Sequence, residues 1–263
     1  MTSLCHALGL TKKGVISIVG AGGKTSLMFG LARELSSSGI SVLTTTTTKF
    51  LSPTADQSTH LIISPLPEEI LSRAKNILKH FPHITAASHC MTGTEKLIGF
   101  SPETIRLFQE SNLFRWIIVE ADGAAGLPLK APASHEPVIP DCTDRVIGII
   151  GLSALGRPLD KHTVFRSELV SKITGLPEGS EILGKTICDI LCHRQGIFQG
   201  TPMGAQRIVF LNQADIPQKA QAGQSIIRNL TRMKTTGFSR VVLGCASVEP
   251  PVLEYHTLQQ PLS

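Results

Sequence analysis

The hydrophobic positions of this chain form short apolar runs that alternate with amphipathic stretches, a pattern typical of strands alternating with helices. The first run, Val15 to Val19, predicts a buried strand, and the apolar stretch 27–35 predicts the helix after it. Further strands are predicted at 41–45, 60–64, 116–119, 145–150, 207–211 and 240–244, and helices at 3–9, 67–79, 101–109, 167–173, 180–191 and 217–233. This alternation predicts an α/β fold, a mainly parallel sheet with helices on both faces.

Two segments depart from this alternation. Residues 84–90 and 96–100 suit strands and flank the turn residues Thr92-Gly93-Thr94, so we expect a β-hairpin insertion over 84–100. The segment after Pro250 is expected to be extended and loosely held. A chain of 263 residues can form one large domain or two small ones, and we expect a single domain over residues 1–263.

The junction between the predicted strand 15–19 and the predicted helix 27–35 is rich in glycine and ends in Lys-Thr-Ser, the order of a phosphate-binding loop. Glycines let the backbone curl so that successive N–H groups face an anion, and the helix start adds its own free N–H groups. Lys24 is expected to reach the β- and γ-phosphates of a nucleotide, and the Thr25 hydroxyl to bind Mg²⁺. The predicted nucleotide-binding residues here are Gly20, Ala21, Gly22, Gly23, Lys24, Thr25 and Ser26.

This loop matches the shorter pattern G-x-x-G-K-T, because Ile18 stands where the full G-x-x-x-x-G-K-[ST] pattern has its first glycine. The alternative interpretation is a glycine-rich turn between a strand and a helix that binds nothing. The order of strand, glycines, lysine, threonine and helix favours phosphate binding, and it predicts a P-loop-like nucleotide-binding domain.

Acidic residues end a second apolar strand. Four apolar residues from Trp116 precede Glu120, and Asp122 follows before a glycine that permits a tight turn. A carboxylate at the end of a strand beside a phosphate loop can hold Mg²⁺ directly or through water. We expect Glu120 to be a magnesium ligand together with Thr25, and Asp122 to orient water or act as a switch. Lys24 and Asp122 are therefore the predicted catalytic residues.

A run of threonines, 44–48, ends the second predicted strand. Ligands of open parallel sheets bind outside the carboxyl ends of the strands, so these hydroxyls are expected to face the phosphate loop. Thr46 and Thr47 are the candidate substrate or switch residues of the run. Strand propensity is the alternative explanation, and it suffices for any single threonine.

A proline-rich segment, 127–140, follows the acidic strand and is expected to be stiff and extended. It carries Lys130, His135 and Glu136, which a closing loop would present to a substrate. Composition alone describes such a segment as a solvent-exposed loop.

The predicted strand 207–211 runs into Asn212-Gln213-Ala214-Asp215. A strand that ends in Asn-Lys-x-Asp is the guanine-reading signature of GTP-binding proteins, in which the aspartate accepts hydrogen bonds from the base. Here Gln213 replaces the lysine, and Asn212 and Asp215 remain as predicted base contacts. A plain Asx turn explains the same residues equally well, so the sequence leaves GTP and ATP open.

Composition narrows the range of partners. The net charge of +5 is spread along the chain without a Lys/Arg block, so neither nucleic-acid nor membrane binding is expected. No apolar run of about 18 residues is present, and no secretory signal is recognised, so a cytoplasmic location is expected. The cysteines are expected to be free thiols; Cys188 and Cys192 share a helix face, but their apolar neighbours favour packing over a metal or selenium site.

Together these motifs resemble the selenium-dependent hydroxylase accessory protein family (YqeC type), whose members are P-loop-like. The resemblance places Lys130, His135 and Glu136 in the family's signature, and it implies a role in the maturation of molybdenum hydroxylases that carry selenium. Phe165 and Gln213 depart from the family pattern, which has histidine and often lysine there. The matching stretches are 19–26, 44–49, 119–124, 129–140, 155–159 and 211–215.

The sequence therefore predicts an Mg²⁺-dependent nucleoside triphosphatase, for GTP or ATP, that assists maturation of a molybdenum hydroxylase by contacting the enzyme or its cofactor. Two alternatives stay open. One is an ATP-driven kinase, ligase or nucleotidyltransferase whose small substrate is bound by Lys130, His135 and Glu136. The other is a nucleotide-gated chaperone or scaffold with little turnover.

Overall fold

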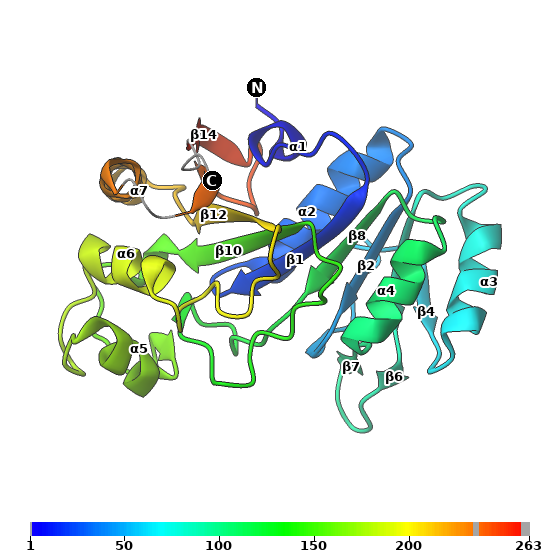
Figure 1. Ribbon diagram of the computed structural model, residues 1–263, viewed down its shortest axis with the longest axis horizontal. Coiled ribbons are helices and arrows are strands. Elements are labelled where there is room, and N and C mark those ends of the chain that lie inside the picture. Colours follow the sequence, from blue (N-terminus) through cyan, green and yellow to red (C-terminus); the bar gives the residue numbers. More distant parts are fainter. Residues whose placement is uncertain (1, 234–236, 259–263) are drawn as a thin grey trace.

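The computed structural model describes residues 2–233 and 237–258, and a central sheet organises them. Its strands are β1 (Gly14–Gly20), β2 (Val42–Thr46), β4 (Leu61–Ile63), β5 (His83–Ala87), β8 (Trp116–Glu120), β10 (Arg145–Gly151), β12 (Gln206–Asn212), β13 (Phe238–Gly244) and β14 (Val252–Thr257). Their order is β14-β13-β12-β10-β1-β8-β2-β5-β4, and each neighbouring pair is parallel except β13 with β14. The strand that leads into the glycine loop, β1, thus lies at the centre between β8 and β10 (Figure 1).

Helices cover both faces of this sheet (Figure 1). Successive side chains of β1 point to opposite faces, so Ile16 and Ile18 pack in one core with α2. Val15 packs on the other face with α3 and α4, and Val19 packs there with α5, α6 and α7. The helices are α1 (Leu4–Ala7), α2 (Lys24–Ser37), α3 (Pro67–Ile77), α4 (Pro102–Glu110), α5 (Ser167–Thr174), α6 (Gly184–Cys192) and α7 (Pro217–Arg232), with a 3₁₀ turn η1 (Leu152–Ala154).

The predicted fold class, an α/β fold with a mainly parallel sheet and helices on both faces, is confirmed. The central strands are almost entirely buried because both faces of a parallel sheet are covered, which is why they appear in the sequence as continuous apolar runs. Helix α2 begins at Lys24, earlier than predicted, because the glycine loop passes directly into it.

The predicted hairpin over 84–100 is wrong in its first half. Residues His83–Ala87 form β5, which pairs in parallel with β2 and β4 in the main sheet. Only β6 (His89–Cys90) and β7 (Lys96–Ile98) form a hairpin, and β3 (Lys49–Leu51) joins it to give a separate antiparallel sheet in the order β3-β7-β6. The main-sheet partners of β5 are distant in sequence, so local turn signals could not reveal them.

The expectation of a loosely held tail after Pro250 is also wrong within the described residues. Residues 252–257 form β14, which pairs antiparallel with β13 at one edge of the sheet. Val252 is buried there, and α1 packs nearby. Without β14, the outer edge of β13 would leave N–H and C=O groups unpaired, and pairing with residues 252–257 satisfies them.

The carboxyl ends of β1, β2, β8, β10 and β12 meet along one edge of the main sheet. Two smaller elements lie at this edge: the antiparallel sheet of β3, β6 and β7, and a parallel pair, β9 (Leu129–Lys130) with β11 (Val164–Phe165). In Figure 1 the hairpin of β6 and β7 lies beyond the lower end of β2. Ligands of open parallel sheets bind at this edge, so the candidate site is sought here.

Gly99 allows the small sheet to lie close to the end of β2. The backbone N–H groups of Gly99 and Phe100 donate to the carbonyls of Thr48 and Thr46, both at 2.9 Å. A Cβ at Gly99 would stand 1.7 Å from the Thr46 carbonyl oxygen, which is closer than any real contact. The small sheet therefore keeps its position only with glycine at this residue.

Replacing Gly99 with alanine is expected to lower the free energy of unfolding by about 1–3 kcal/mol, because the clashing atom belongs to the backbone and cannot rotate away. Gly123→Ala is the matched control, since a Cβ there would meet nothing within 4 Å. Urea denaturation of both variants measures the difference. Equal stabilities would contradict the close packing of Gly99 on Thr46.

Candidate phosphate-binding site

The glycine loop packs directly against the backbone of β10. Gly20, Gly22 and Gly23 have φ angles of 97°, 86° and 120°, which L side chains rarely adopt. A Cβ at Gly20 would lie 2.3 Å from the Ile149 carbonyl oxygen, and one at Gly22 would lie 2.4 Å from the Gly151 nitrogen. The glycines are therefore required both by backbone conformation and by the closeness of the neighbouring strand.

Five consecutive N–H groups of this loop, from Gly22 to Ser26, have no acceptor within the described part of the chain. The first intrahelical hydrogen bond of α2 is donated by the Leu27 N–H, at 3.0 Å from the Gly23 carbonyl oxygen. The Gly20 and Gly22 carbonyls accept hydrogen bonds from the Lys24 ammonium and the Asn212 amide, at 2.8 and 2.6 Å. The loop thus presents a group of free donors at a helix N-terminus, which suits an anion.

Lys24 is held at the base of the loop by oxygen atoms of the protein. Besides the Gly20 carbonyl, its Nζ lies 3.3 Å from Asp122 Oδ1 and 3.8 Å from Glu120 Oε1. Its side chain is only 5% exposed, yet it lines the main cavity. This position puts a positive charge directly behind the free N–H groups.

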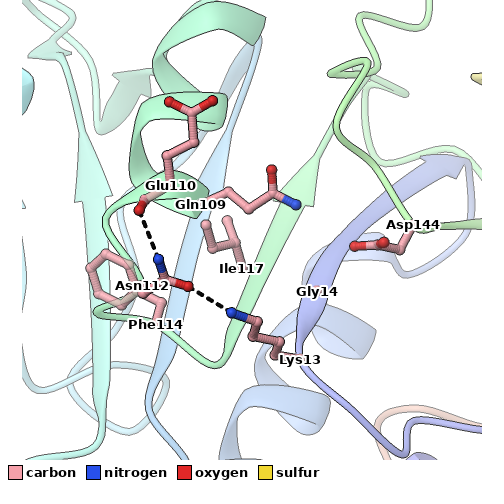
Figure 2. Close-up of a pocket in the computed structure, with 8 residues that line it drawn as sticks. All are labelled: Lys13, Gly14, Gln109, Glu110, Asn112, Phe114, Ile117 and Asp144. Carbon is pink, nitrogen blue, oxygen red and sulfur yellow. Dashed lines mark hydrogen bonds between the residues drawn. The ribbon is translucent and has the colours of Figure 1, made fainter.

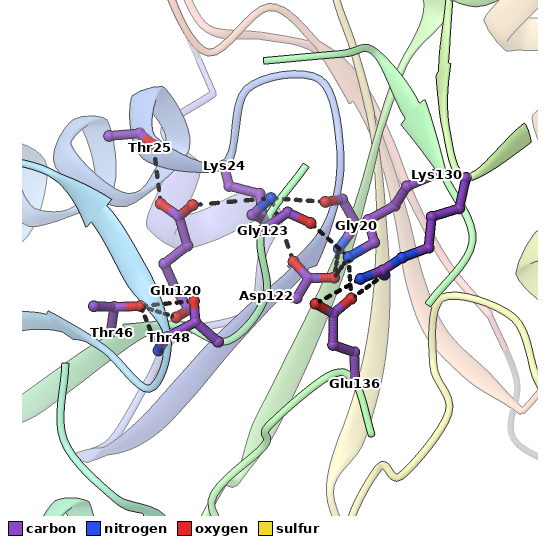
Figure 3. A network of polar contacts seen from close by, with 11 residues as sticks. Gly20, Lys24, Thr25, Thr46, Thr48, Glu120, Asp122, Gly123, Lys130 and Glu136 are labelled. Carbon is purple, nitrogen blue, oxygen red and sulfur yellow. Dashed lines mark hydrogen bonds and ion pairs between the residues drawn. The ribbon is translucent and has the colours of Figure 1, made fainter. Parts of the chain in front are cut away.

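Thr25 and Glu120 approach each other across the loop, as Figure 3 shows. The Thr25 hydroxyl donates to Glu120 Oε2 at 2.9 Å, and both residues line the cavity. Burial raises the pKa of Glu120, and the nearby Lys24 charge and the Thr25 hydrogen bond offset this effect only in part. A hydroxyl and a carboxylate are oxygen ligands that suit Mg²⁺, so the donor set fits the predicted metal.

Asp122 lies behind the cavity rather than on its wall. It is 1% exposed, and Oδ2 accepts from the Gly20 N–H at 3.1 Å and pairs with Lys130 Nζ at 2.9 Å. Oδ1 makes no hydrogen bond, although Lys24 Nζ lies 3.3 Å away. Asp122 therefore joins the phosphate loop to the segment that follows β8, and it is not among the residues that line the cavity; its predicted part in orienting water stays a prediction.

Lys130 and Glu136, both labelled in Figure 3, continue this chain of charges, and Arg166 ends it. Lys130 is fully buried; its Nζ donates to the Gly123 carbonyl at 2.6 Å and pairs with Glu136 Oε2 at 2.9 Å. Arg166 forms a bidentate ion pair with the same carboxylate, and each of its two terminal nitrogens donates to a different carboxylate oxygen. Burial raises the pKa of Glu136, but hydrogen bonds from Arg166 and Lys130 outweigh it and lower the pKa to about 2.

A cavity of about 1240 Å³ opens above the glycine loop. His135 and Glu136 lie on its wall as predicted for substrate-facing residues, whereas Lys130 does not. Phe165 and Gln213 also line it, together with the turn 123–127. The cavity exceeds the roughly 300–1,000 Å³ of ordinary ligand sites, so it has room beyond one small ligand.

The hydroxyl groups of Thr46 and Thr47 in the threonine run donate hydrogen bonds to backbone carbonyls of the protein. The Thr46 hydroxyl donates to the Glu120 carbonyl oxygen and the Thr47 hydroxyl to the Val138 carbonyl oxygen, both at 2.6 Å. Thr48, rather than these two, lines the cavity. Thr46 and Thr47 therefore hold the neighbouring strand end and the proline-rich segment, and any contact of theirs with a substrate stays a prediction.

Asn212 is buried and holds the glycine loop. Its Nδ2 donates to the Gly22 carbonyl, and its Oδ1 accepts from the Ala246 N–H at 2.8 Å. Gln213 Oε1 accepts from the Ser153 hydroxyl at 2.6 Å, while Asp215 is exposed and is not part of the cavity wall. Asn212 thus has both amide atoms hydrogen-bonded within the protein, and Asp215 lies outside the cavity lining.

Comparison with known proteins adds a family. The family model described as "YqeC protein" matches residues 16–168. The YqeC protein of Escherichia coli (strain K12) is 35% identical over 234 residues, which is 87% of this chain and 88% of that protein. The chain belongs to the YqeC family. This confirms the family suggested by the sequence motifs.

Among solved structures, chloroplast FtsY from Physcomitrella patens matches this YqeC-family chain with a TM-score of 0.34 and 14% identity. The match covers 96% of this chain and 64% of that one. A similarity this low carries no weight for function. The site has to be judged on its own geometry.

The range matched by the YqeC model contains all the members of the buried charge network: Lys24, Glu120, Asp122, Lys130, Glu136 and Arg166. Asn212 and Asp215 lie beyond it. Sequence reasoning missed Arg166 as a site residue, because a single arginine before a helix gives no signal; only its φ of 63° and its pairing with Glu136 reveal it. It also missed Lys49 and Lys96, which line the cavity from the small sheet.

A second cavity, of about 320 Å³, lies at the opposite edge of the sheet where β1 begins (Figure 2). Its polar groups bind one another: Lys13 Nζ donates to Asn112 Oδ1 at 2.6 Å, and Asn112 Nδ2 donates to the Glu110 carbonyl at 2.9 Å. Asp144 Oδ2 accepts from the Val15 N–H at 2.8 Å. These polar groups therefore bind other parts of the protein, whereas the free N–H groups of the glycine loop lie at the carboxyl edge of the sheet.

Two findings concern metals and membranes. Residues 2–233 and 237–258 contain no group of three or more His, Cys, Asp or Glu side chains placed to hold a metal, and Cys188 and Cys192 are free thiols. A metal at Thr25 and Glu120 would thus complete its shell with phosphate and water oxygens. No helix in these ranges is long and apolar enough to cross a membrane.

Replacing Glu136 with glutamine is expected to lower the free energy of unfolding at pH 7 by about 1–3 kcal/mol. The change removes the carboxylate charge that pairs with Arg166 and Lys130. The folded-state pKa of about 2 lies below the ordinary 4.5, so the carboxylate stabilises the fold above pH 4.5 and loses this effect as the pH falls toward 2. Denaturation of both proteins across this range measures the difference. The exposed Glu168→Gln is the control, and a pH-independent gap would contradict the assignment.

Proposed function

We propose that this YqeC-family protein binds a nucleoside triphosphate with Mg²⁺ and hydrolyses it. One observation carries the proposal: the residues from Gly22 to Ser26 line the main cavity and have five free backbone N–H groups, with the Lys24 ammonium at the base of the same loop. Such a group of donors at a helix N-terminus is suited to the β- and γ-phosphates of a nucleotide. Thr25 and Glu120 at the same place support a metal-dependent reaction.

Lys24 is proposed to exchange its protein partners for phosphate oxygens. It is paired with Asp122 and with the Gly20 carbonyl, so nucleotide binding competes with contacts that already exist. Its charge would then neutralise the developing negative charge on the transferred phosphoryl group. Asp122, held by the Gly20 N–H and by Lys130, is proposed to keep the loop in its binding shape. We therefore assign Asp122 a positioning role in place of water orientation.

The Thr25 hydroxyl and the Glu120 carboxylate would hold Mg²⁺. When bound, the ion supplies charge stabilisation to the phosphates. A cation at this position also offsets the cost of keeping the Glu120 carboxylate ionised in a buried place, a cost that its raised pKa reflects.

The role of the hydrolysis is proposed from the family. Members of the YqeC family are associated with the maturation of selenium-dependent molybdenum hydroxylases, and we propose that turnover here serves the delivery or modification of the hydroxylase cofactor. Direct contact with a molybdenum hydroxylase is part of this proposal. The volume of the cavity gives specific support to a second candidate, an ATP-driven kinase, ligase or nucleotidyltransferase, because it leaves room for an acceptor.

Replacing Thr25 with alanine is expected to weaken Mg²⁺-dependent binding of non-hydrolysable GTP and ATP analogues by about tenfold, while Thr25→Ser keeps the hydroxyl and most of the affinity. Lys24→Ala is expected to abolish phosphate release while the far-ultraviolet circular dichroism spectrum stays unchanged. Calorimetric titration with and without Mg²⁺, and a phosphate-release assay, give the two measurements. The exposed Lys75→Ala is the control; unchanged hydrolysis by Lys24→Ala would refute the assignment.

Replacing Asp215 with alanine is expected to change the ratio of GTP to ATP affinity by less than about twofold, because its side chain is exposed and lies outside the cavity wall. Asn212→Ala is expected to weaken both nucleotides alike, since Asn212 supports the Gly22 carbonyl rather than a base. Parallel titrations with the two analogues give the ratio. A loss confined to GTP in either variant would instead establish guanine reading.

A further inference from the structure

The main cavity has a second wall that the proposed nucleotide site does not use. The glycine loop, Thr25 and Glu120 line one part of the cavity, and Lys49, Phe50, Leu51 and Lys96 line another. These last four residues belong to the small sheet of β3 and β7, which is separate from the main sheet. We call the three exposed ones, Lys49, Leu51 and Lys96, the flap wall.

The register of the small sheet decides which side chains share a face. Lys49 pairs with Ile98, Phe50 with Leu97, and Leu51 with Lys96. Because side chains alternate along a strand, Lys49, Leu51 and Lys96 share one face, and Phe50 and Leu97 share the other, which is buried. Lys49 and Lys96 are diagonal neighbours across the two strands, with Cα atoms about 7–8 Å apart in such a pair. Two ammonium groups can therefore reach one anion between them.

The flap wall carries charge that the protein leaves without a counterion. Among the described residues, neither the Lys49 nor the Lys96 ammonium forms an ion pair with a carboxylate, and both side chains are exposed. The acidic groups of the same cavity are already engaged: Glu120 by Thr25, and Glu136 by Lys130 and Arg166. The flap wall is thus positive, and its two lysines share one face of the small sheet with Leu51, which is 58% exposed.

The position of the flap wall is fixed relative to the proposed magnesium ligand. The Gly99 and Phe100 N–H groups bind the Thr48 and Thr46 carbonyls, and the Thr46 hydroxyl binds the Glu120 carbonyl. This series of hydrogen bonds connects β7 to the end of β2 and then to the end of β8. These hydrogen bonds therefore fix the small sheet, and the flap wall on it, relative to Glu120.

We propose that the flap wall binds a second ligand, a small organic phosphate monoester, beside the nucleotide. Two lysines match the charge of a dianionic phosphate better than that of a carboxylate, and Leu51 offers an apolar surface to the organic part. This proposal rests on the proposed function, because the second ligand shares a cavity with a nucleotide on the glycine loop. It names a substrate class for the same cavity and uses space that one nucleotide leaves open.

The test uses the full-length protein saturated with Mg²⁺ and a non-hydrolysable ATP or GTP analogue, titrated calorimetrically with phenyl phosphate. Lys49→Ala and Lys96→Ala are each expected to weaken phenyl phosphate binding by about fivefold or more, with nucleotide affinity unchanged. Lys75→Ala, an exposed lysine of α3, is the matched control. Leu51→Ser is expected to weaken phenyl phosphate but not inorganic phosphate, and phenylacetate is expected to bind more weakly than phenyl phosphate.

Equal phenyl phosphate affinity in the wild type and in both lysine variants would overturn the proposal, as would its failure to bind. A loss of nucleotide affinity in the lysine variants would also overturn it, because the flap wall would then serve the nucleotide itself. If the wild type binds no nucleotide, the proposed function fails. Titration of nucleotide-free protein with phenyl phosphate then tests the flap wall separately, by the same comparison of variants.

Discussion

The burial of charged side chains at the carboxyl edge of the sheet constrains which residues can surround them. Lys24, Asp122 and Lys130 are almost removed from solvent, and an unpaired charge there would cost several kcal/mol. The protein meets this constraint by alternating signs along one series of contacts, from Glu120 through Lys24, Asp122, Lys130 and Glu136 to Arg166. Each inner group has a partner on both sides, so the loss of one charge still leaves each inner neighbour one partner.

This series joins four segments that are distant in the sequence, the last of them at Arg166, just before α5. Lys24 begins the helix after the glycine loop, Asp122 follows β8, and Glu136 lies in the proline-rich segment. The Asp122 carboxylate also accepts the Gly20 N–H, so the shape of the loop depends on the same ion pairs. A phosphate that attracts Lys24 away from Asp122 would act on a group that is already coupled to the cavity wall at Glu136. The phosphate loop and the wall of the cavity are thus connected by contacts and not only by proximity.

The cavity combines two kinds of construction. Near the glycine loop, charges are paired and the free donors are backbone N–H groups, whose positions follow from β1, β10 and α2. On the flap wall, charges are carried by lysines on a small sheet that hydrogen bonds attach to the end of β2. Rigid donors suit the chemistry of a triphosphate, and long flexible side chains suit an anion that enters and leaves. Both belong to the edge where parallel strands end.

The sequence by itself determined the fold class and the position of the glycine loop. Short, mainly apolar runs such as Val15–Val19, which only Ser17 interrupts, are typical of strands inside a covered parallel sheet. The turn before Lys24 needs positive φ angles, and its glycines show this need in the sequence itself. The sequence also determined the acidic end of β8, because Glu120 ends the buried strand and Asp122 follows it closely. These features depend on residues adjacent in the chain.

The tertiary structure decided which side chains face the cavity and which support it. Lys130 is a buried partner of Asp122 and Glu136, Asn212 holds the loop from behind, and β5 joins the main sheet instead of a hairpin. Arg166, Lys49 and Lys96 enter the site from distant segments. No local pattern records these positions, because an ion pair or a strand pairing depends on the free energy of burying two groups together, and the partners are separated by 30 to 190 residues in pairs such as Glu136–Arg166 and Gly22–Asn212.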